Sequence, residues 1–137
     1  MGHREIVRAQ LKLDEGVKAK PYKDTVGKLT VGVGRNLDDV GLRTDEINYL
    51  LDNDIQQAEA DAKTLFTNFD ALSDARKAVL VNMSFNLGLS RLSGFKNFKA
   101  AVEAGAFEQA AVEMLSSKWA EQVGARATRL AKAMREG

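Results

Sequence analysis

Two carboxylic acids and one hydroxyl group follow one another near the start of the chain. Eight residues separate Glu15 from Asp24, and five more separate Asp24 from Thr30. Cleavage of a glycosidic bond needs a proton donor for the leaving oxygen and a second group that activates water or attacks the sugar. Two carboxyl groups divide these roles when one is held protonated and the other stays ionised. The three residues are therefore candidates for glycosidic cleavage, although residue types alone leave open a solvated glutamate and a turn aspartate without any catalytic role.

The segment before Glu15 is predicted to be a helix. Residues 4–14 carry an apolar stripe near the 3.6-residue period, and Gly16 stands where a glycine cap ends a helix. Glu15 therefore falls in the last turn or just past it. The negative end of the helix dipole favours a protonated carboxyl group at that place, which suits a general acid.

The segment after Glu15 is predicted to form the sheet. Residues 17–33 mix valine, leucine and threonine with glycine, which is typical of a small antiparallel hairpin or meander. The residues from Asp24 to Gly27 have turn chemistry, so we expect Asp24 to lie in a polar turn and to stay ionised. Thr30 falls on the next strand, and residues 36–42 are expected to be a polar loop.

The remainder of the chain has helical periodicity. Thr44 is a candidate N-cap of a long helix, and Ser73 or Asp74 opens another helix that Gly88 closes. Further helices are expected at residues 95–104, at 107–115, around Trp119, and at 125–134. One helix, a small sheet and then a helical bundle make the fold class α+β by segregation rather than alternation.

The composition restricts the chemistry that is available. With 137 residues, 45% of them hydrophobic and 28% charged, the chain has the size and composition of one soluble globular domain. It contains no cysteine, which excludes disulfides and thiolate metal sites. The single histidine, His3, gives no support to a histidine metal centre or a Ser-His-Asp triad. We therefore expect carboxylate chemistry, with no metal and no cofactor.

Charge is spread unevenly along the chain, whose net charge is +1. Residues 38–61 hold eight acids against Arg43, whereas residues 117–137 hold five bases against two acids. The basic end is typical of a solvated helix face, but it also fits attraction to an anionic polymer such as nucleic acid or cell wall. A helical module that binds nucleic acid or a partner protein is therefore a rival hypothesis.

The sequence has no feature that predicts a membrane segment. Its first residues lack the apolar region of a signal peptide, and no apolar run approaches the roughly 18 to 20 residues of a membrane span. We expect a monomeric protein made in the cytoplasm, without stable membrane insertion and without a nucleic-acid partner.

The stretch from residue 13 to 34 strongly resembles the phage lysozyme family of glycoside hydrolases. The family signature combines an acidic-Glu-Gly helix end, Tyr-x-Asp-x-x-Gly and Thr-x-Gly-x-Gly. This chain carries it as Asp14-Glu15-Gly16, Tyr22-Lys23-Asp24-Thr25-Val26-Gly27 and Thr30-Val31-Gly32-Val33-Gly34. The likeness continues through residues 78–88, Gly94-Phe95, Trp119 and two C-terminal arginines, so it covers nearly the full chain.

The resemblance implies a lysozyme-like fold with a substrate cleft between two lobes. The whole chain, residues 1–137, would be a single catalytic domain. Its sheet lobe would span about residues 15–43 and its connecting helix about residues 44–64. The helical lobe would comprise about residues 70–137 together with the N-terminal helix, residues 4–14.

The resemblance also implies a function. An endolysin of this kind hydrolyses the β-1,4 linkage between N-acetylmuramic acid and N-acetylglucosamine in peptidoglycan and so lyses its host. The expected reaction inverts the anomeric centre. It would stay in the host cytoplasm until a holin releases it to the periplasmic wall. A lytic transglycosylase, which acts on the same bond with one carboxylic acid, is the alternative, and the presence of Asp24 and Thr30 disfavours it.

Three further residues are candidates for contacts with the sugar. Tyr22 would stack on a sugar or pack in the core or at the rim, and Gly32 would let a sugar approach the backbone. Asn86 would bind an N-acetyl group or cap its helix. The resemblance itself implies two supporting ion pairs, Arg126 with Glu15 and Arg129 with Asp14.

The chain departs from the family pattern at two places. The family often has a histidine after the last glycine of the signature, where this chain has Arg35. We expect a difference in stability there rather than lost activity. Residues 36–43 also form a much shorter connection than in the best-known members, so the cleft wall on that side is expected to be lower.

Overall fold

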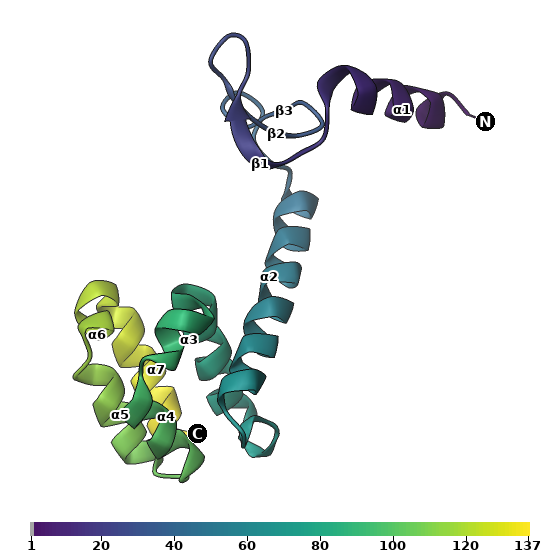
Figure 1. Cartoon of the computed structure of the whole chain (residues 1–137). Helices are drawn as coiled ribbons and strands as arrows, with labels where there is room; N and C mark the ends of the chain where they lie inside the picture. The colour runs from purple at the N-terminus through teal and green to yellow at the C-terminus, as the bar shows by residue number, and fades with distance from the viewer. Residues whose placement is uncertain (1) are drawn as a thin grey trace. The chain divides into compact units, whose positions relative to one another are not determined.

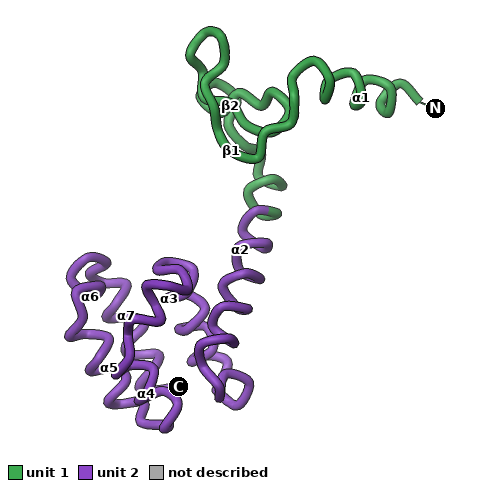
Figure 2. Tube along the Cα trace, viewed as in Figure 1, with its two compact units in different colours: residues 1–49 green, residues 50–137 purple. Residues whose placement is uncertain are grey.

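The computed structural model describes residues 2–137, which divide into two compact units (Figure 2). The first unit ends at Tyr49 and the second begins at Leu50, within a single long helix. Seven α-helices and one three-stranded sheet make up these residues (Figure 1). The chain is therefore mostly helical with one small antiparallel sheet near its N-terminus, which confirms the predicted α+β class.

The first unit begins with helix α1, His3–Glu15. Gly16 ends this helix with a φ of 76°, and its N–H donates to the carbonyl of Lys12. Only glycine adopts such a backbone without steric cost, so the predicted glycine stop is confirmed and Glu15 is the last helical residue. The end of the helix thus determines the position of the Glu15 backbone.

The sheet of the first unit comprises β1 (Lys18–Lys23), β2 (Leu29–Gly32) and β3 (Arg35–Asn36). The strands are antiparallel in the order β1-β2-β3, with β2 in the centre. Strand β3 is an addition to the predicted hairpin, and it takes Asn36 from the stretch expected to be loop. A backbone hydrogen bond from Leu37 to Leu29, 2.7 Å long, continues that pairing.

Helix α2 spans Thr44–Leu65, so Thr44 is its first residue and not the N-cap that the sequence predicted. The N-cap is Arg43. The carbonyl of Arg43 accepts the first helical hydrogen bond, from the Ile47 N–H at 2.9 Å. Glu46 reaches back to accept the Arg43 N–H at 2.8 Å, which is the reciprocal half of a capping box. The helix is therefore capped by the third residue after its N-cap, rather than by the threonine hydroxyl.

The second unit packs the remaining helices around one core. They are η1 (Phe69–Ala71), α3 (Asp74–Ser93), α4 (Lys96–Glu103), α5 (Phe107–Leu115), α6 (Lys118–Val123) and α7 (Ala125–Glu136). Ser73 caps α3 by accepting the Arg76 N–H, as predicted. Gly88 has a non-helical backbone, with a φ of 79° and a ψ of 165°, so a helix closes there as predicted, and a further helical turn that completes α3 follows directly.

Aromatic and methionine side chains fill the core of the second unit. Phe66 and Phe98 are buried and meet edge to face with ring centroids 5.9 Å apart. Trp119 is also buried and belongs to this core. None of the helices in residues 2–137 has the length and apolar character needed to cross a membrane.

Candidate active site

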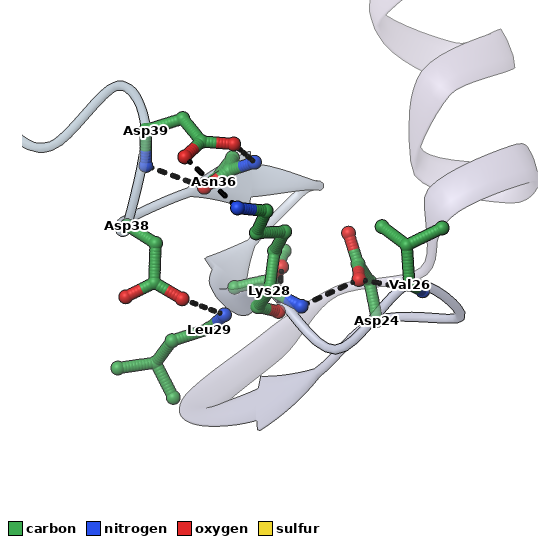
Figure 3. A network of polar contacts seen from close by, with 8 residues as sticks. Asp24, Val26, Lys28, Leu29, Asn36, Asp38 and Asp39 are labelled. Carbon is green, nitrogen blue, oxygen red and sulfur yellow. Dashed lines mark hydrogen bonds and ion pairs between the residues drawn. The ribbon is translucent and has the colours of Figure 1, made fainter.

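Asp24 occupies the turn between β1 and β2, where its own backbone and side chain hold the turn together. Its N–H donates to the Lys28 carbonyl at 2.9 Å, and its carbonyl accepts the Gly27 N–H at 3.0 Å. Its Oδ1 accepts two more backbone N–H groups, from Val26 at 3.0 Å and from Lys28 at 2.8 Å (Figure 3). The carboxyl group is thereby oriented through one oxygen, and the bonds made by the described residues leave its Oδ2 available to a water.

Thr30 lies on the central strand β2 and is buried, with 4% of its surface exposed. Its Oγ1 donates to the Lys28 carbonyl at 2.9 Å. Because a hydroxyl has one proton and two lone pairs, this bond leaves Thr30 as an acceptor toward any further partner. The same Lys28 carbonyl thus holds both the Asp24 backbone and the Thr30 hydroxyl.

The strand register places two candidate residues on one face of the sheet. Thr30 stands opposite Tyr22 of β1 and opposite Asn36 of β3. Residues directly opposite one another in an antiparallel pair share a face. Asp24 follows the last residue of β1, in the turn, and its N–H and the Thr30 hydroxyl donate to the same Lys28 carbonyl. The sheet therefore brings Tyr22 and Thr30 to one face, and the turn links Asp24 to Thr30 through the Lys28 carbonyl.

Gly32, at the end of β2, has open space where a side chain would stand. It has a φ of 68°, and no atom lies within 4 Å of the position that a Cβ would take. This openness is compatible with the close approach of a sugar to the backbone. That role stays a prediction.

Glu15 lies against the turn that joins β2 to β3. A Cβ placed on Gly34 would stand 2.7 Å from Glu15 Oε2 and 3.0 Å from its Cδ. Such distances are below van der Waals contact, so the carboxyl group occupies space that only a glycine at this position leaves free. The acid at the end of α1 is thereby brought to the Thr-x-Gly-x-Gly segment that also carries Thr30.

Arg35 ties β3 to the start of α2, within the first unit. Its Nη1 donates to Glu46 Oε1 at 2.7 Å and to the Gly41 carbonyl at 3.2 Å. The pKa of Glu46 is lowered to about 2, first by this hydrogen bond from Arg35 and then by the hydrogen bond from the Arg43 backbone N–H. The bond to Glu46 in turn raises the pKa of Arg35. Arg35 therefore has a structural partner within the first unit.

Two residues that matter for the geometry of the sheet lobe are absent from the sequence prediction, Asp38 and Glu46. Asp38 accepts the Leu29 N–H through its Oδ2 at 2.7 Å. Nothing in the sequence beyond the polar composition of its loop indicates this bond. Glu46 had a usable signal, because it follows Arg43 by three residues, the spacing of a capping box.

The second unit carries the other predicted residues. Asn86 of α3 accepts the indole Nε1–H of Trp119 through its Oδ1 at 2.7 Å, so this oxygen serves the tryptophan rather than the helix end. Arg126 of α7 donates through Nε and Nη2 to Asn82 Oδ1, at 3.0 and 2.8 Å. A contact between Asn86 and substrate stays a prediction.

The two supporting ion pairs also stay predictions, because each would join a residue of the first unit to one of the second. Asp14 lies on α1 and is exposed, and Arg129 lies on α7 and is exposed. The lobe boundaries and the cleft expected between the lobes have the same status.

The family described as phage lysozyme matches residues 12–135, a stretch that includes every predicted site residue. Two relatives from Dictyostelium discoideum, named probable T4-type lysozyme 2 and probable T4-type lysozyme 1, are 29% and 28% identical to the chain. Each alignment covers 96% of this chain and 94% of the relative.

A third relative is the pre-baseplate central spike protein Gp5 of Enterobacteria phage T4. It is 25% identical over 88% of this chain but only 26% of its own length. A lysozyme-like segment therefore also occurs inside a much longer protein. The match over residues 12–135 and the Glu15, Asp24 and Thr30 signature together lead to one conclusion: the chain belongs to the phage lysozyme family, a family of glycosidases that act on peptidoglycan.

Proposed function

We propose that this protein hydrolyses the β-1,4 linkage between N-acetylmuramic acid and N-acetylglucosamine, with Glu15 as the acid and Asp24 as the base. The observation that carries the proposal is the arrangement around the Lys28 carbonyl. This carbonyl holds the Asp24 backbone at 2.9 Å and the Thr30 hydroxyl at 2.9 Å. We infer that Asp24 Oδ2 and Thr30 Oγ1, the two acceptors that these bonds leave available, bind one water.

These two acceptors suit the capture of a single water molecule. A water that donates one proton to Asp24 and the other to Thr30 points its remaining lone pairs away from both. As that oxygen attacks the anomeric carbon, the proton on the Asp24 side passes to the carboxylate. Attack from the face opposite the leaving group inverts the anomeric centre.

Glu15 completes the reaction on the leaving side. It transfers its proton to the glycosidic oxygen as that bond breaks, and it becomes ionised. It stands at the end of α1. Arg126, as its proposed ion-pair partner, would lie beside the carboxylate that forms. An inverting enzyme requires the two carboxyl groups to stand roughly 6.5 to 9.5 Å apart, with the water between them.

The remaining predicted contacts concern the sugar chain. Tyr22 shares a face of the sheet with Thr30 and offers a ring for stacking. Gly32 leaves the backbone open to the sugar. The side-chain nitrogen of Asn86 is directed by the bond from Trp119 and offers a donor to an N-acetyl carbonyl.

A turbidity assay on outer-membrane-permeabilised bacteria tests the proposal. Glu15→Gln keeps the size of the side chain and removes the transferable proton, so it should abolish clearing while its thermal unfolding stays near that of the wild type. Glu5→Gln, an exposed acid of the same helix, is the matched control and should clear cells normally. Full clearing by Glu15→Gln would refute the assignment of the acid.

The reaction product separates hydrolysis from the alternative, lytic transglycosylation. Hydrolysis adds water and leaves a reducing sugar, whereas a transglycosylase closes an anhydro ring. Mass spectrometry of the released glycan ends should therefore show the reducing sugar. Thr30→Val, which keeps shape and removes the hydroxyl, should slow this reaction without changing the product.

The biological setting belongs to the same proposal. We expect a monomeric endolysin that lyses its bacterial host, stays in the host cytoplasm until a holin opens the inner membrane, and then acts on the periplasmic wall. Its partner would be the peptidoglycan glycan strand, with no nucleic acid, no stable membrane insertion and no cofactor. Salt-sensitive DNA binding without any clearing of cells would favour the rival binding module instead.

A further inference from the structure

We infer that Asp38 is a positioning residue for the hydrolytic water, acting through the peptide group that joins Lys28 to Leu29. The inference rests on the proposed function, because it concerns the same Asp24 and Thr30 pair. Asp38 lies in the loop after β3, before the start of α2.

The peptide group between Lys28 and Leu29 is hydrogen-bonded at both of its ends. Its carbonyl accepts the Asp24 N–H and the Thr30 hydroxyl, each at 2.9 Å. Its N–H donates to Asp38 Oδ2 at 2.7 Å (Figure 3). Since a peptide group is planar, its carbonyl and its N–H cannot turn independently. Asp38 therefore sets the direction of the carbonyl that holds both groups of the water site.

Charge adds to this geometric effect. A hydrogen bond to an ionised carboxylate is shorter and roughly twice as strong as a neutral one, and 2.7 Å is at the short end of that range. Hydrogen bonds in a chain also polarise one another. A carboxylate on the N–H end therefore makes the Lys28 carbonyl a better acceptor for the Thr30 hydroxyl.

The loop holds Asp38 in place before any substrate arrives. The N–H groups of Val40 and Gly41 both donate to the Asn36 carbonyl, at 3.1 and 3.2 Å. The Asn36 side chain accepts the Asp39 N–H at 2.9 Å. These bonds close the loop on both sides of Asp38, so its carboxylate reaches Leu29 from a fixed backbone.

Asp39 provides a matched control within the same loop. Its carboxylate contacts the Lys28 ammonium group at 3.3 Å and the Asn36 amide at 3.1 Å, and both bonds are exposed. Among these contacts there is none to the peptide group between Lys28 and Leu29. Removal of this acid changes the charge of the loop equally, yet it should leave the water site in place.

Steady-state hydrolysis of purified peptidoglycan by the full chain tests the inference. We expect Asp38→Ala to lower kcat by about 10- to 100-fold, the loss that a displaced reacting group produces, with KM within about twofold. Asp38→Asn keeps an acceptor oxygen without the charge, so its kcat should lie between those of the wild type and Asp38→Ala. Asp39→Asn should match the wild type in both constants.

Nuclear magnetic resonance of the amide protons supplies a readout that does not depend on activity. The Leu29 N–H signal should move upfield in Asp38→Ala and by less in Asp38→Asn, while Asp39→Asn leaves it unchanged. If Asp38→Ala does not fold, Asp38→Asn carries the same comparison with a smaller drop in kcat.

The outcomes separate this inference from the proposed function. A wild-type protein that does not hydrolyse peptidoglycan overturns both. An active wild type whose Asp38 variants are folded and keep full kcat overturns the positioning role alone. Equal losses in the Asp38 and Asp39 variants would also overturn it, since they would indicate general weakening of the loop.

Discussion

Glu15 Oε2 lies only 2.7 Å from the place where a side chain on Gly34 would begin. The Glu15 side chain, at the end of α1, therefore packs directly against Gly34, in the turn between β2 and β3. Gly34 also has a φ of 68°, a conformation that favours glycine. Both properties of this position, its backbone and its missing side chain, serve the placement of the candidate acid.

Gly34→Ala should reduce peptidoglycan hydrolysis by about 10- to 100-fold, because the new methyl group displaces the Glu15 carboxyl. The left-handed backbone adds a stability cost of about 1 to 2 kcal/mol. Gly105→Ala is the control: its φ is 72° and nothing lies within 4 Å of its Cβ position. Both variants should lose similar stability in urea unfolding, but only Gly34→Ala should lose activity. Equal activity in the two would mean that the contact with Glu15 has no consequence.

Glu46→Gln should reveal a pH-dependent part of the stability. The pKa of Glu46 is about 2 in the folded protein against an ordinary 4.5, because Arg35 and the Arg43 N–H stabilise the carboxylate. A lowered folded pKa stabilises the fold above pH 4.5, and this contribution disappears as the pH falls from 4.5 toward 2. The wild type should therefore unfold at higher urea than the variant at pH 7, and the two should converge near pH 2.

Glu59→Gln serves as the control for that comparison. Glu59 makes an exposed pair with Lys63 one turn away on α2, at 3.3 Å. Such pairs contribute little, so the variant should differ less from the wild type at pH 7. A Glu46→Gln protein as stable as the wild type at pH 7 would show that the bond between Arg35 and Glu46 is energetically neutral.

Glu103→Ala should destabilise the second unit more than Lys99→Ala does. The Glu103 carboxylate accepts a hydrogen bond from the Lys99 ammonium group at 2.7 Å. It also accepts hydrogen bonds from the N–H and the hydroxyl of Thr67, at 3.0 and 2.8 Å. Its pKa is lowered to about 2, first by Lys99 and then by Thr67. Removal of the carboxylate releases both partners, for a loss of about 1 kcal/mol in these exposed surroundings. Urea unfolding of both variants at pH 7 measures the difference, and an equal loss would contradict a separate role for Thr67.

Trp119→Phe should separate packing from the hydrogen bond to Asn86. The phenyl ring keeps much of the buried contact but cannot donate, so Asn86 Oδ1 loses its partner at 2.7 Å. We expect a loss of about 1 kcal/mol in stability. If Asn86 contacts substrate, KM should also rise. In a double-mutant cycle with Asn86→Ala, the two changes should couple, and strict additivity would show that the bond contributes nothing.

Local sequence patterns were sufficient for most of the secondary structure. The glycine that ends α1, the serine that caps α3 and the bounds of α5 all follow from residues within a few positions of each other. The boundary errors have local causes as well. The N-cap of α2 is Arg43 rather than Thr44, because Glu46 accepts the Arg43 N–H, and a further helical turn follows the break at Gly88.

The chemical identity of the candidate site was also contained in the sequence. Helix-end acid, turn aspartate and strand threonine form a motif whose members lie within one short stretch, so their spacing alone carries the family signature. The hydrogen bonds that orient Asp24 span two and four residues, and such bonds follow from turn chemistry.

Only the tertiary structure decided which distant groups meet. The bonds from Leu29 to Asp38, from Arg35 to Glu46 and from Trp119 to Asn86 join residues 9, 11 and 33 positions apart. No periodicity encodes such pairs, because each depends on how two elements pack and on which polar group remains unpaired after the local bonds are made. The three candidate site residues can thus be identified from the sequence, whereas the distant groups that hydrogen-bond around them are brought together only by folding.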